Sequence, residues 1–254
     1  MKRHLFLAYG IASYAIFLGV FLYAIGFLGN FLVPRSLDSA RPGSLGAALT
    51  IDLLLCVAFA LQHSGMARPT FKRWWTRIVP EPIERSTYVL FSSVAMVLLF
   101  WLWQPLGGVI WNVEHPVGSA VLWGVYGLGW LTVLVTTFLI NHFDLFGLRQ
   151  VVLYFRDKPY RPLGFVTPGP YKYVRHPLYV GWLMVFWATP TMSAGHLLLA
   201  IAITGYILVA IQLEERNLAE GHGEYEEYRR SVPMLIPSGR RAGGRIAGGA
   251  SATS

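Results

Sequence analysis

The stretch Arg175-His176-Pro177-Leu178-Tyr179-Val180-Gly181 joins a basic loop to an apolar segment and organises the last third of the chain. Proline is well tolerated at the first helical position, so a helix is predicted to open at Pro177 with Arg175 and His176 at its N-terminal end. Backbone N–H groups and a guanidinium at such an end favour a carboxylate or phosphate. Gly181 leaves room for a ligand or another backbone to approach closely. Interface anchoring of a membrane helix is the alternative interpretation.

The composition around this stretch is typical of a polytopic membrane protein. The 254 residues are 54% hydrophobic and only 13% charged. Lys and Arg outnumber Asp and Glu by 21 to 13, but these basic residues lie between apolar segments, which argues against nucleic acid as a partner. The single cysteine, Cys56, lies inside an apolar run, so neither an intramolecular disulfide nor a Cys-rich metal site is expected.

Six apolar segments approach the roughly 20 residues that a membrane-spanning helix needs. They predict an all-α polytopic membrane helix bundle of five to six transmembrane segments. The fifth segment is too short to span comfortably, so the last two are predicted to form a short helical hairpin that turns within residues 190–195. The first segment lacks a clear cleavage site and is expected to be a membrane helix rather than a removed signal peptide. The segments are Leu5–Leu28, Leu45–Leu61, Thr87–Trp103, Gly118–Ile140, Leu178–Thr191 and Leu197–Leu213.

The loops between these segments carry unequal charge. If the segments cross alternately, all 21 Lys and Arg residues except Arg35 and Arg41 fall on one side. The positive-inside rule then places both termini and the two large loops in the cytoplasm. A single integral-membrane domain is predicted over residues 1–237, with four membrane helices in 1–140 and the loop, hairpin and a cytoplasmic C-terminal helix in 141–237. Residues 238–254 lack core-forming side chains and are predicted to be a disordered tail.

Polar residues concentrate near the predicted cytoplasmic ends of the apolar helices, where such groups are costly and usually functional. Each cluster also has a plain structural interpretation: His63 as an interface histidine, Arg85 paired with Glu84, and Asp144 paired with Arg149. The convergence of several clusters on one face of an apolar bundle instead favours a pocket. The clusters are Gln62–Pro69, Glu84–Tyr88, Asn141–Gln150, Arg175–Gly181 and Glu214–Asn217.

Two adjacent glutamates, Glu214 and Glu215, end the last apolar segment. Neighbouring helical residues point about 100° apart, so both carboxylates cannot aim at one point. One is predicted to bind a ligand hydroxyl or ribose diol, and the other to pair with a cation such as Arg175 or Arg216. No metal is expected, because the sequence has no His-x-x-x-His, Glu-x-x-His or Cys pair. The absence of a Gly-x-Gly-x-x-Gly or Walker motif excludes Rossmann and P-loop nucleotide domains.

The C-terminal motifs resemble, as a set, those of the isoprenylcysteine carboxyl methyltransferase and phospholipid methyltransferase group. The set consists of Gly169–Tyr171, Arg175–Gly181, the glutamate pair and the Tyr- and Pro-containing segment 223–237. Members of this group are integral-membrane enzymes that use S-adenosylmethionine. The resemblance covers about residues 166–237 and implies an S-adenosylmethionine site at the cytoplasmic face. The implied cofactor-binding residues are Tyr171, Arg175, His176, Pro177, Tyr179, Gly181, Glu214 and Glu215.

The N-terminal half narrows this resemblance. The segments Gln62–Lys72, Glu84–Leu90 and Asn141–Gln150 look like those of the bacterial methanethiol S-methyltransferases, which make dimethyl sulfide from methanethiol. The resemblance implies a small thiol substrate and a protein set among the lipids of a bacterial inner membrane.

Two alternatives to the small thiol stay open. One is a prenylated cysteine or phospholipid acceptor, for which an opening toward the bilayer is expected, whereas a methanethiol enzyme is expected to have a closed, small cavity. The other is a non-catalytic membrane protein of nitrogen-oxide or haem-related metabolism, because a related branch near nitric-oxide reduction genes shares some segments.

The implied chemistry assigns roles to the polar clusters. A thiol reacts as its thiolate, and a free thiol titrates around 8.5, so the site must remove or stabilise that proton. Histidine suits this pH range, and His63, His142 or the His142/Asp144 pair is predicted to act as the base, with Arg85 and Arg149 as thiolate stabilisers.

The donor side is assigned in the same way. Arg175 and the helix start are predicted to hold the donor carboxylate, and Glu214 or Glu215 the ribose hydroxyls. The aromatic face of Tyr179 is predicted to cradle the sulfonium.

Overall fold

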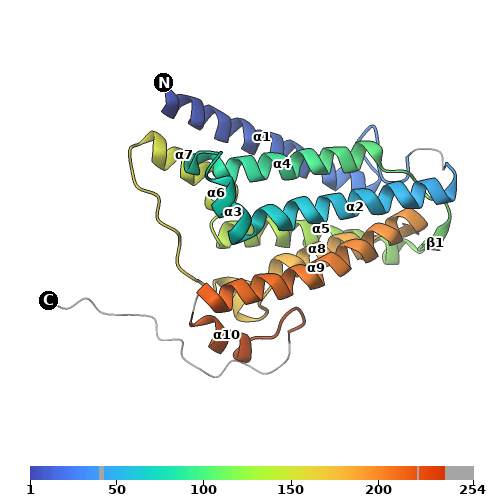
Figure 1. Cartoon of the computed structure of the whole chain (residues 1–254). Helices are drawn as coiled ribbons and strands as arrows, with labels where there is room; N and C mark the ends of the chain where they lie inside the picture. Colours follow the sequence, from blue (N-terminus) through green and yellow to red (C-terminus); the bar gives the residue numbers. More distant parts are fainter. Residues whose placement is uncertain (40–42, 222, 238–254) are drawn as a thin grey trace.

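A computed structural model of the chain describes residues 1–39, 43–221 and 223–237. Its long helices run side by side, and short helices gather at one end of the bundle (Figure 1). Within the described residues, five helices are long and apolar enough to cross a membrane, which confirms the predicted all-α polytopic bundle. These five are α1 (Lys2–Gly29), α2 (Leu45–Ala67), α4 (Glu81–Leu102), α5 (Pro116–Leu139) and α9 (Ala194–Gly221).

The remaining elements are short. The predicted tail, residues 238–254, lies outside the described residues. The short elements are α3 (Pro69–Trp75), β1 (Val109–Asn112), α6 (His142–Leu145), α7 (Leu148–Phe155), a 3₁₀ helix (Gly169–Lys172), α8 (Pro177–Trp187), β2 (Thr191–Ser193) and α10 (Tyr225–Ser231).

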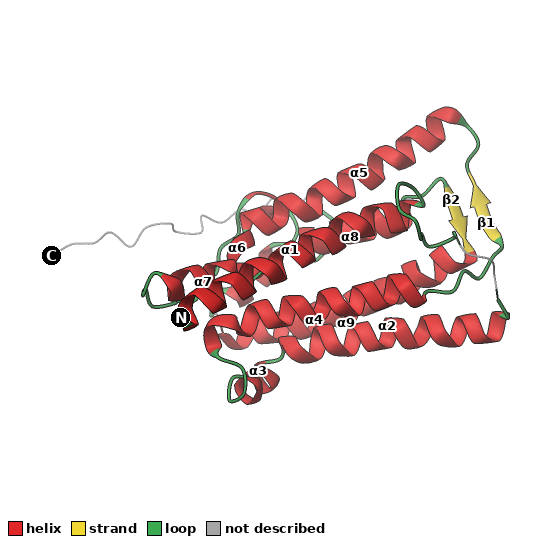
Figure 2. Cartoon of the chain, turned by 90° about the horizontal axis from the view of Figure 1, so that it is seen from above, coloured by secondary structure: helices red, strands yellow, loops and turns green. Residues whose placement is uncertain are grey.

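Helix α8 begins at Pro177 with His176 as its N-cap, as predicted. Its 11 residues extend only about 16 Å, which is half of a bilayer core. The predicted turn into α9 is more structured than expected, because β2 pairs there with β1 in an antiparallel ribbon (Figure 2). Strands of three and four residues carry too short an alternation to be recognised in the sequence. The ribbon pairs backbone groups of two loops that would otherwise lack partners.

Several membrane helices extend past the apolar segments that predicted them. Helix α2 continues from Leu61 to Ala67, and α4 begins at Glu81 rather than Thr87. Helical hydrogen bonding satisfies the backbone near the membrane surface whether or not the side chains are apolar. As a result, His63 and Arg85 lie on helices rather than in loops.

Glycines bring α5 and α8 into close contact. A Cβ atom on Gly181 would lie 2.9 Å from the carbonyl oxygen of Gly129, and one on Gly129 would lie 2.9 Å from the carbonyl oxygen of Gly181. The close approach that the sequence predicted at Gly181 is therefore made by another backbone. This contact helps to anchor the short helix α8, which cannot span the bundle by itself.

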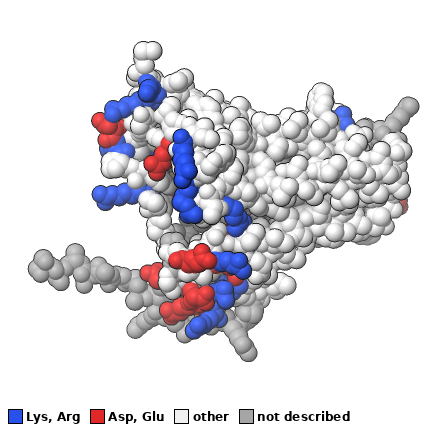
Figure 3. Space-filling model, in the orientation of Figure 1, with Lys and Arg blue, Asp and Glu red and all other residues white. Residues whose placement is uncertain are grey.

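Charged side chains crowd one end of the bundle, whereas the visible body is almost free of them (Figure 3). We call the end that carries α3, α6, α7 and α10 the charged end, and the end that carries β1 and β2 the strand end (Figure 1). The asymmetry follows the distribution of Lys and Arg along the sequence.

Candidate active site

A cavity of about 330 Å³ lies inside the bundle and is lined by α1, α2, α4, α5, α8 and α9. Its titratable groups on α2, α4 and α6 lie toward the charged end, whereas its α4 serines and Tyr206 lie near the middle of their helices. The rest of the lining is apolar. The polar lining residues are His63, Arg85, Tyr88, Ser92, Ser93, Thr137, His142, Tyr179 and Tyr206.

His63 stands at the polar end of this cavity beside Tyr88. The Tyr88 hydroxyl lies 3.1 Å from both ring nitrogens of His63, and the Ser92 hydroxyl lies 3.2 Å from Nδ1. The imidazole also stacks on Phe59, with ring centroids 5.3 Å apart. These contacts hold a titratable ring in the cavity wall, which is a more specific arrangement than a histidine at a membrane interface.

Arg85 supplies a positive charge next to these groups. Its guanidinium lies 4.8 Å from the centre of the Tyr88 ring, and its Nε donates to the carbonyl oxygen of Leu145 at 2.7 Å. The alternative interpretation, a pair between Arg85 and Glu84, is not the arrangement found, since Glu84 faces Lys72 at 3.2 Å. Arg85 therefore remains free of a carboxylate partner among the described residues and faces the cavity.

His142 occupies a separate part of the cavity wall. Its Nε2 lies 2.8 Å from the hydroxyl of Tyr14, and its Nδ1 lies 2.8 Å from that of Thr137. The ring stacks on Phe138 with centroids 4.2 Å apart. Burial lowers the pKa of His142, which favours the neutral imidazole. Both ring nitrogens are thus engaged by hydroxyl groups.

Asp144 does not pair with His142. It forms an ion pair with Arg149 at 2.7 Å and accepts a hydrogen bond from Tyr160 at 3.3 Å. Residues two apart on a helical turn do not face each other, so His142 points into the cavity while Asp144 points away. Among the described residues, neither Asp144 nor Arg149 lines the cavity. The local salt bridge that the sequence left open is the arrangement present.

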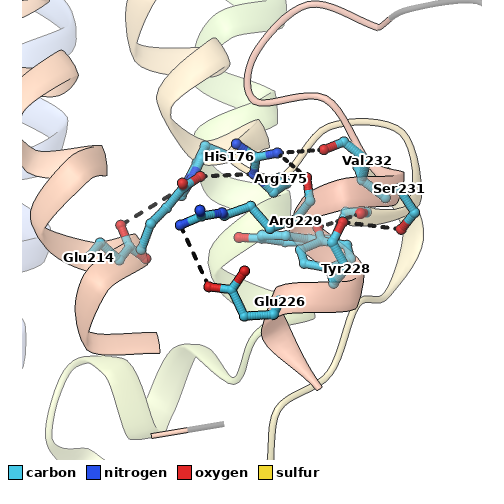
Figure 4. A network of polar contacts seen from close by, with 10 residues as sticks. Arg175, His176, Glu214, Glu226, Tyr228, Arg229, Ser231 and Val232 are labelled. Carbon is cyan, nitrogen blue, oxygen red and sulfur yellow. Dashed lines mark hydrogen bonds and ion pairs between the residues drawn. The ribbon is translucent and has the colours of Figure 1, made fainter. Parts of the chain in front are cut away.

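Arg175 and Glu215 form the centre of a second polar network at the charged end. Figure 4 shows Arg175 and His176 in this network. Arg175 Nε donates to Glu215 Oε1 at 2.8 Å, and the Nε2 of His176 lies 3.0 Å from the same oxygen. Arg175 Nη1 donates to the carbonyl oxygens of Arg229 and Val232 at 2.7 and 2.6 Å. Glu215 is thus the member of the glutamate pair that meets a cation, while Arg175 ties α8 and α9 to the C-terminal segment.

The backbone continues this attachment. The N–H of Arg175 donates to the carbonyl of Pro233 at 2.9 Å, and the N–H of His176 donates to that of Met234 at 3.2 Å. Two donors at the start of α8 are therefore used within the chain. This limits how far the helix N-terminus can serve as an anion site.

Glu214 lies on a different side of α9 from Glu215. It is seven residues from Ile207, which lines the cavity, so the two share one helix face. Its Oε2 accepts a hydrogen bond at 3.1 Å from Tyr179, another cavity residue. The Glu214 side chain is 47% exposed, against 9% for Glu215. Its Oε1 has no partner among the described residues.

Tyr171 completes the surroundings of Glu214. Burial and the Glu214 carboxylate raise the pKa of the Tyr171 phenol, which keeps it protonated as a hydrogen-bond donor. Pro177 is buried at the start of α8, and Gly181 faces α5, so both shape the helix rather than this surface. Tyr171, Tyr179 and Glu214 thus form a polar group next to the polar end of the cavity.

Several cavity residues were not predicted as site residues, among them Tyr88, Ser92 and Tyr206. Residues 85, 88 and 92 have the i, i+3, i+7 spacing of one helix face, which was a usable signal. Tyr206 lies in an apolar segment, and its position becomes evident only from tertiary contacts such as the 3.0 Å contact with Ser64 on α2. No group of three His, Cys, Asp or Glu side chains able to hold a metal ion occurs within the part of the chain that the structure describes.

Comparison with known proteins identifies close relatives. The chain matches the phospholipid methyltransferase family model over residues 125–224. It is 59% identical over 238 residues to the methanethiol S-methyltransferase of Crocosphaera subtropica, covering 93% of both chains. It is 56% identical over 238 residues to the methanethiol S-methyltransferase of Mycobacterium tuberculosis, covering 93% of this chain and 98% of the relative. No solved structure matches significantly.

Proposed function

The chain belongs to the family of the methanethiol S-methyltransferases, and from this premise we propose that it methylates methanethiol to dimethyl sulfide with S-adenosylmethionine as donor. The observation that carries the proposal is the junction between the polar end of the cavity and the group formed by Tyr171, Tyr179 and Glu214. A hydrogen bond of 3.1 Å between Tyr179 and Glu214 joins the two. In this arrangement the polar donor site and the apolar acceptor site lie next to each other.

Glu214 is the residue best placed to take the ribose hydroxyls of the donor. Its carboxylate is half exposed, one oxygen is free among the described residues, and Tyr179 orients the other. A carboxylate that accepts two hydroxyl donors is a common and strong hydrogen-bond arrangement. The S-adenosylmethionine sulfonium supplies the methyl group when bound, and the adjoining aromatic faces suit a cation.

Arg175 has a different role from the one its sequence position suggests. Its guanidinium is committed to Glu215 and to two carbonyl oxygens of the C-terminal segment. We therefore assign Arg175 and Glu215 as positioning residues that hold α8, α9 and α10 together around the donor site. The donor carboxylate is left to other groups at the charged end.

His63 is our candidate for the base that takes the thiol proton. Both His63 and His142 line the cavity and contact two hydroxyl groups. We choose His63 because its partner Tyr88 lies against a cation, the Arg85 guanidinium, at 4.8 Å from the ring centre. The thiol S–H bond breaks as the proton moves to His63, and the sulfur forms its bond to the transferred methyl as the donor's sulfur–methyl bond breaks. Arg85 and the Tyr88 hydroxyl stabilise the thiolate. General-base assistance such as that proposed for His63 raises a reaction rate by about 10²–10⁴-fold.

The charged end is proposed to face the cytoplasm of a bacterial inner membrane, with both termini on that side. The donor is a polar, water-soluble molecule, and the polar donor site lies at this end. The basic residues there also follow the positive-inside rule.

The test is an assay of purified protein in detergent with labelled S-adenosylmethionine and methanethiol. Gas chromatography measures dimethyl sulfide, and calorimetry measures donor affinity. Glu214→Gln is expected to weaken donor binding and product formation. Glu114→Gln, the same change at an exposed position near the strand end, is expected to leave both unchanged.

Each result has a distinct meaning. Dimethyl sulfide formation that depends on Glu214 supports both donor site and substrate. If the protein binds the donor but forms no dimethyl sulfide, the proposed acceptor changes from methanethiol to a prenylated cysteine or a lipid. Absence of both binding and product would overturn the proposal.

A further inference from the structure

The cavity extends far deeper than the polar groups that the proposed reaction uses. On α4 its lining runs from Arg85 to Phe100, which is about 22 Å at 1.5 Å per residue. On α1 it runs from Phe17 to Leu28. Past Ser93 the α4 lining consists of Met96, Leu99 and Phe100, all apolar.

This depth does not match a one-carbon thiol. Methanethiol bound beside His63, as proposed above, would fill only that end of the cavity and leave the apolar remainder unfilled. A volume of about 330 Å³ lies in the range of sites that hold much larger ligands. The small cavity expected for a methanethiol enzyme is therefore not what the structure contains.

We propose that the enzyme also methylates linear alkanethiols of several carbons, with the alkyl chain extended along α1 and α4 toward the strand end. The inference rests on the proposed function, because the thiol is deprotonated by His63 and methylated in the same way as methanethiol. The thiol proton leaves, one sulfur–methyl bond forms and the donor's breaks, so the products are a methyl alkyl sulfide and S-adenosylhomocysteine. A cavity that is elongated along α1 and α4 suits an unbranched chain better than a bulky one.

Chain length is the first variable to test. Each added methylene buried in the cavity lowers KM about fourfold, provided that the cavity holds it without strain. The purified enzyme is assayed with methanethiol, 1-butanethiol, 1-hexanethiol and tert-butanethiol. The expected order of kcat/KM is hexanethiol above butanethiol above methanethiol, with the branched thiol lowest.

Blocking the deep part of the cavity is the second variable. Ala24 lines the cavity and is buried, whereas Ala15 on the same helix is exposed on the outer surface. Ala24→Leu is expected to lower the ratio of hexanethiol to methanethiol kcat/KM at least tenfold, and Ala15→Leu to leave it unchanged. Met96→Phe is a second blocking variant in case Ala24→Leu folds poorly. Partition of the thiols into detergent affects the parent enzyme and all variants equally, so it cancels when their kcat/KM ratios are compared.

The outcomes separate this inference from the function on which it rests. Methanethiol turnover without butanethiol or hexanethiol turnover would overturn the inference and leave the proposed function standing. Hexanethiol turnover that neither Ala24→Leu nor Met96→Phe affects would also overturn it, because the chain would lie elsewhere. If no thiol is methylated and the donor does not bind, both the inference and the proposed function are overturned.

Discussion

At the scale of single residues, the site depends on side chains that are neighbours in sequence yet serve different purposes. Glu215 is buried against Arg175, and Glu214 stays half exposed beside Tyr179. The 100° step between adjacent helical residues enforces this division. In the same way His142 enters the cavity wall while Asp144 pairs outside it.

His63→Gln tests the proposed base. We expect kcat for methanethiol to fall by about 10²–10⁴-fold, because the amide cannot accept the thiol proton. Donor affinity is expected to stay unchanged, since His63 lies on the acceptor side. The loss should shrink at alkaline pH, where more thiol is already ionised.

His115 provides the control for this change. It is exposed and precedes α5 near the strand end, so His115→Gln should behave like the parent enzyme. Equal kcat for His63→Gln and the parent would exclude His63 as the base.

His142 makes a prediction about pH and stability. Burial lowers its pKa below the ordinary 6.5, so between these two values the unfolded chain binds more protons than the folded chain. Stability from this group is present above about pH 6.5 and is lost as pH falls toward the folded-state pKa. Thermal unfolding in detergent should show a smaller drop in Tm from pH 7 to 5 in His142→Gln than in the parent. Equal drops would mean that protonation of His142 does not oppose folding.

At the scale of elements, the short helix α8 depends on its contact with α5. It opens at Pro177 and presents Tyr179 to the cavity, but its 11 residues cannot anchor themselves across a bilayer. The close approach of the α5 and α8 backbones anchors α8, and small residues commonly allow such close approach between membrane helices. The charged end adds a second attachment through Arg175 and the C-terminal segment.

Gly181→Ala tests this contact. The added Cβ would lie 2.9 Å from the carbonyl oxygen of Gly129, so the helices must separate, at a cost of about 1–3 kcal/mol. We expect a lower Tm and weaker donor binding, since Tyr179 shifts with α8. Gly124→Ala on α5 meets nothing within 4 Å and should leave Tm unchanged or raise it. A Gly181→Ala protein as stable as Gly124→Ala would show that the contact is dispensable.

At the scale of the whole molecule, the polar and apolar parts of the candidate site are arranged along the long direction of the helix bundle. The charged end, where Lys, Arg, Asp and Glu gather (Figure 3), holds the residues proposed for the donor site. The apolar part of the cavity lining extends toward the strand end. Under the proposed function, a polar donor would reach the site from water, and an apolar acceptor would bind within the bundle.

Orientation is testable with two cysteine substitutions in a Cys56→Ala background. Glu114 lies near the strand end and Lys158 near the charged end, and both are exposed. A membrane-impermeant maleimide added to intact cells should label Glu114→Cys but not Lys158→Cys, because only the strand end is proposed to face outward. Both should react after the cells are lysed. The reverse labelling would invert the proposed orientation.

Sequence alone determined the parts of this protein that depend on local pattern. Apolar segment length predicted the membrane helices, and Pro177 predicted the start of α8. The motifs of the C-terminal half and the three N-terminal segments indicated the family. Each of these signals lies within a short run of residues, so no distant contact is needed to read it.

Only the tertiary structure decided which polar residues meet. Arg175 could have faced a ligand, but distant carbonyl groups of the C-terminal segment take its guanidinium. Tyr88 and Tyr206 enter the site because α4 and α9 turn those faces inward. The cavity's depth likewise depends on how six helices pack, since a space between helices is a property of their mutual distance and rotation, which no single segment encodes.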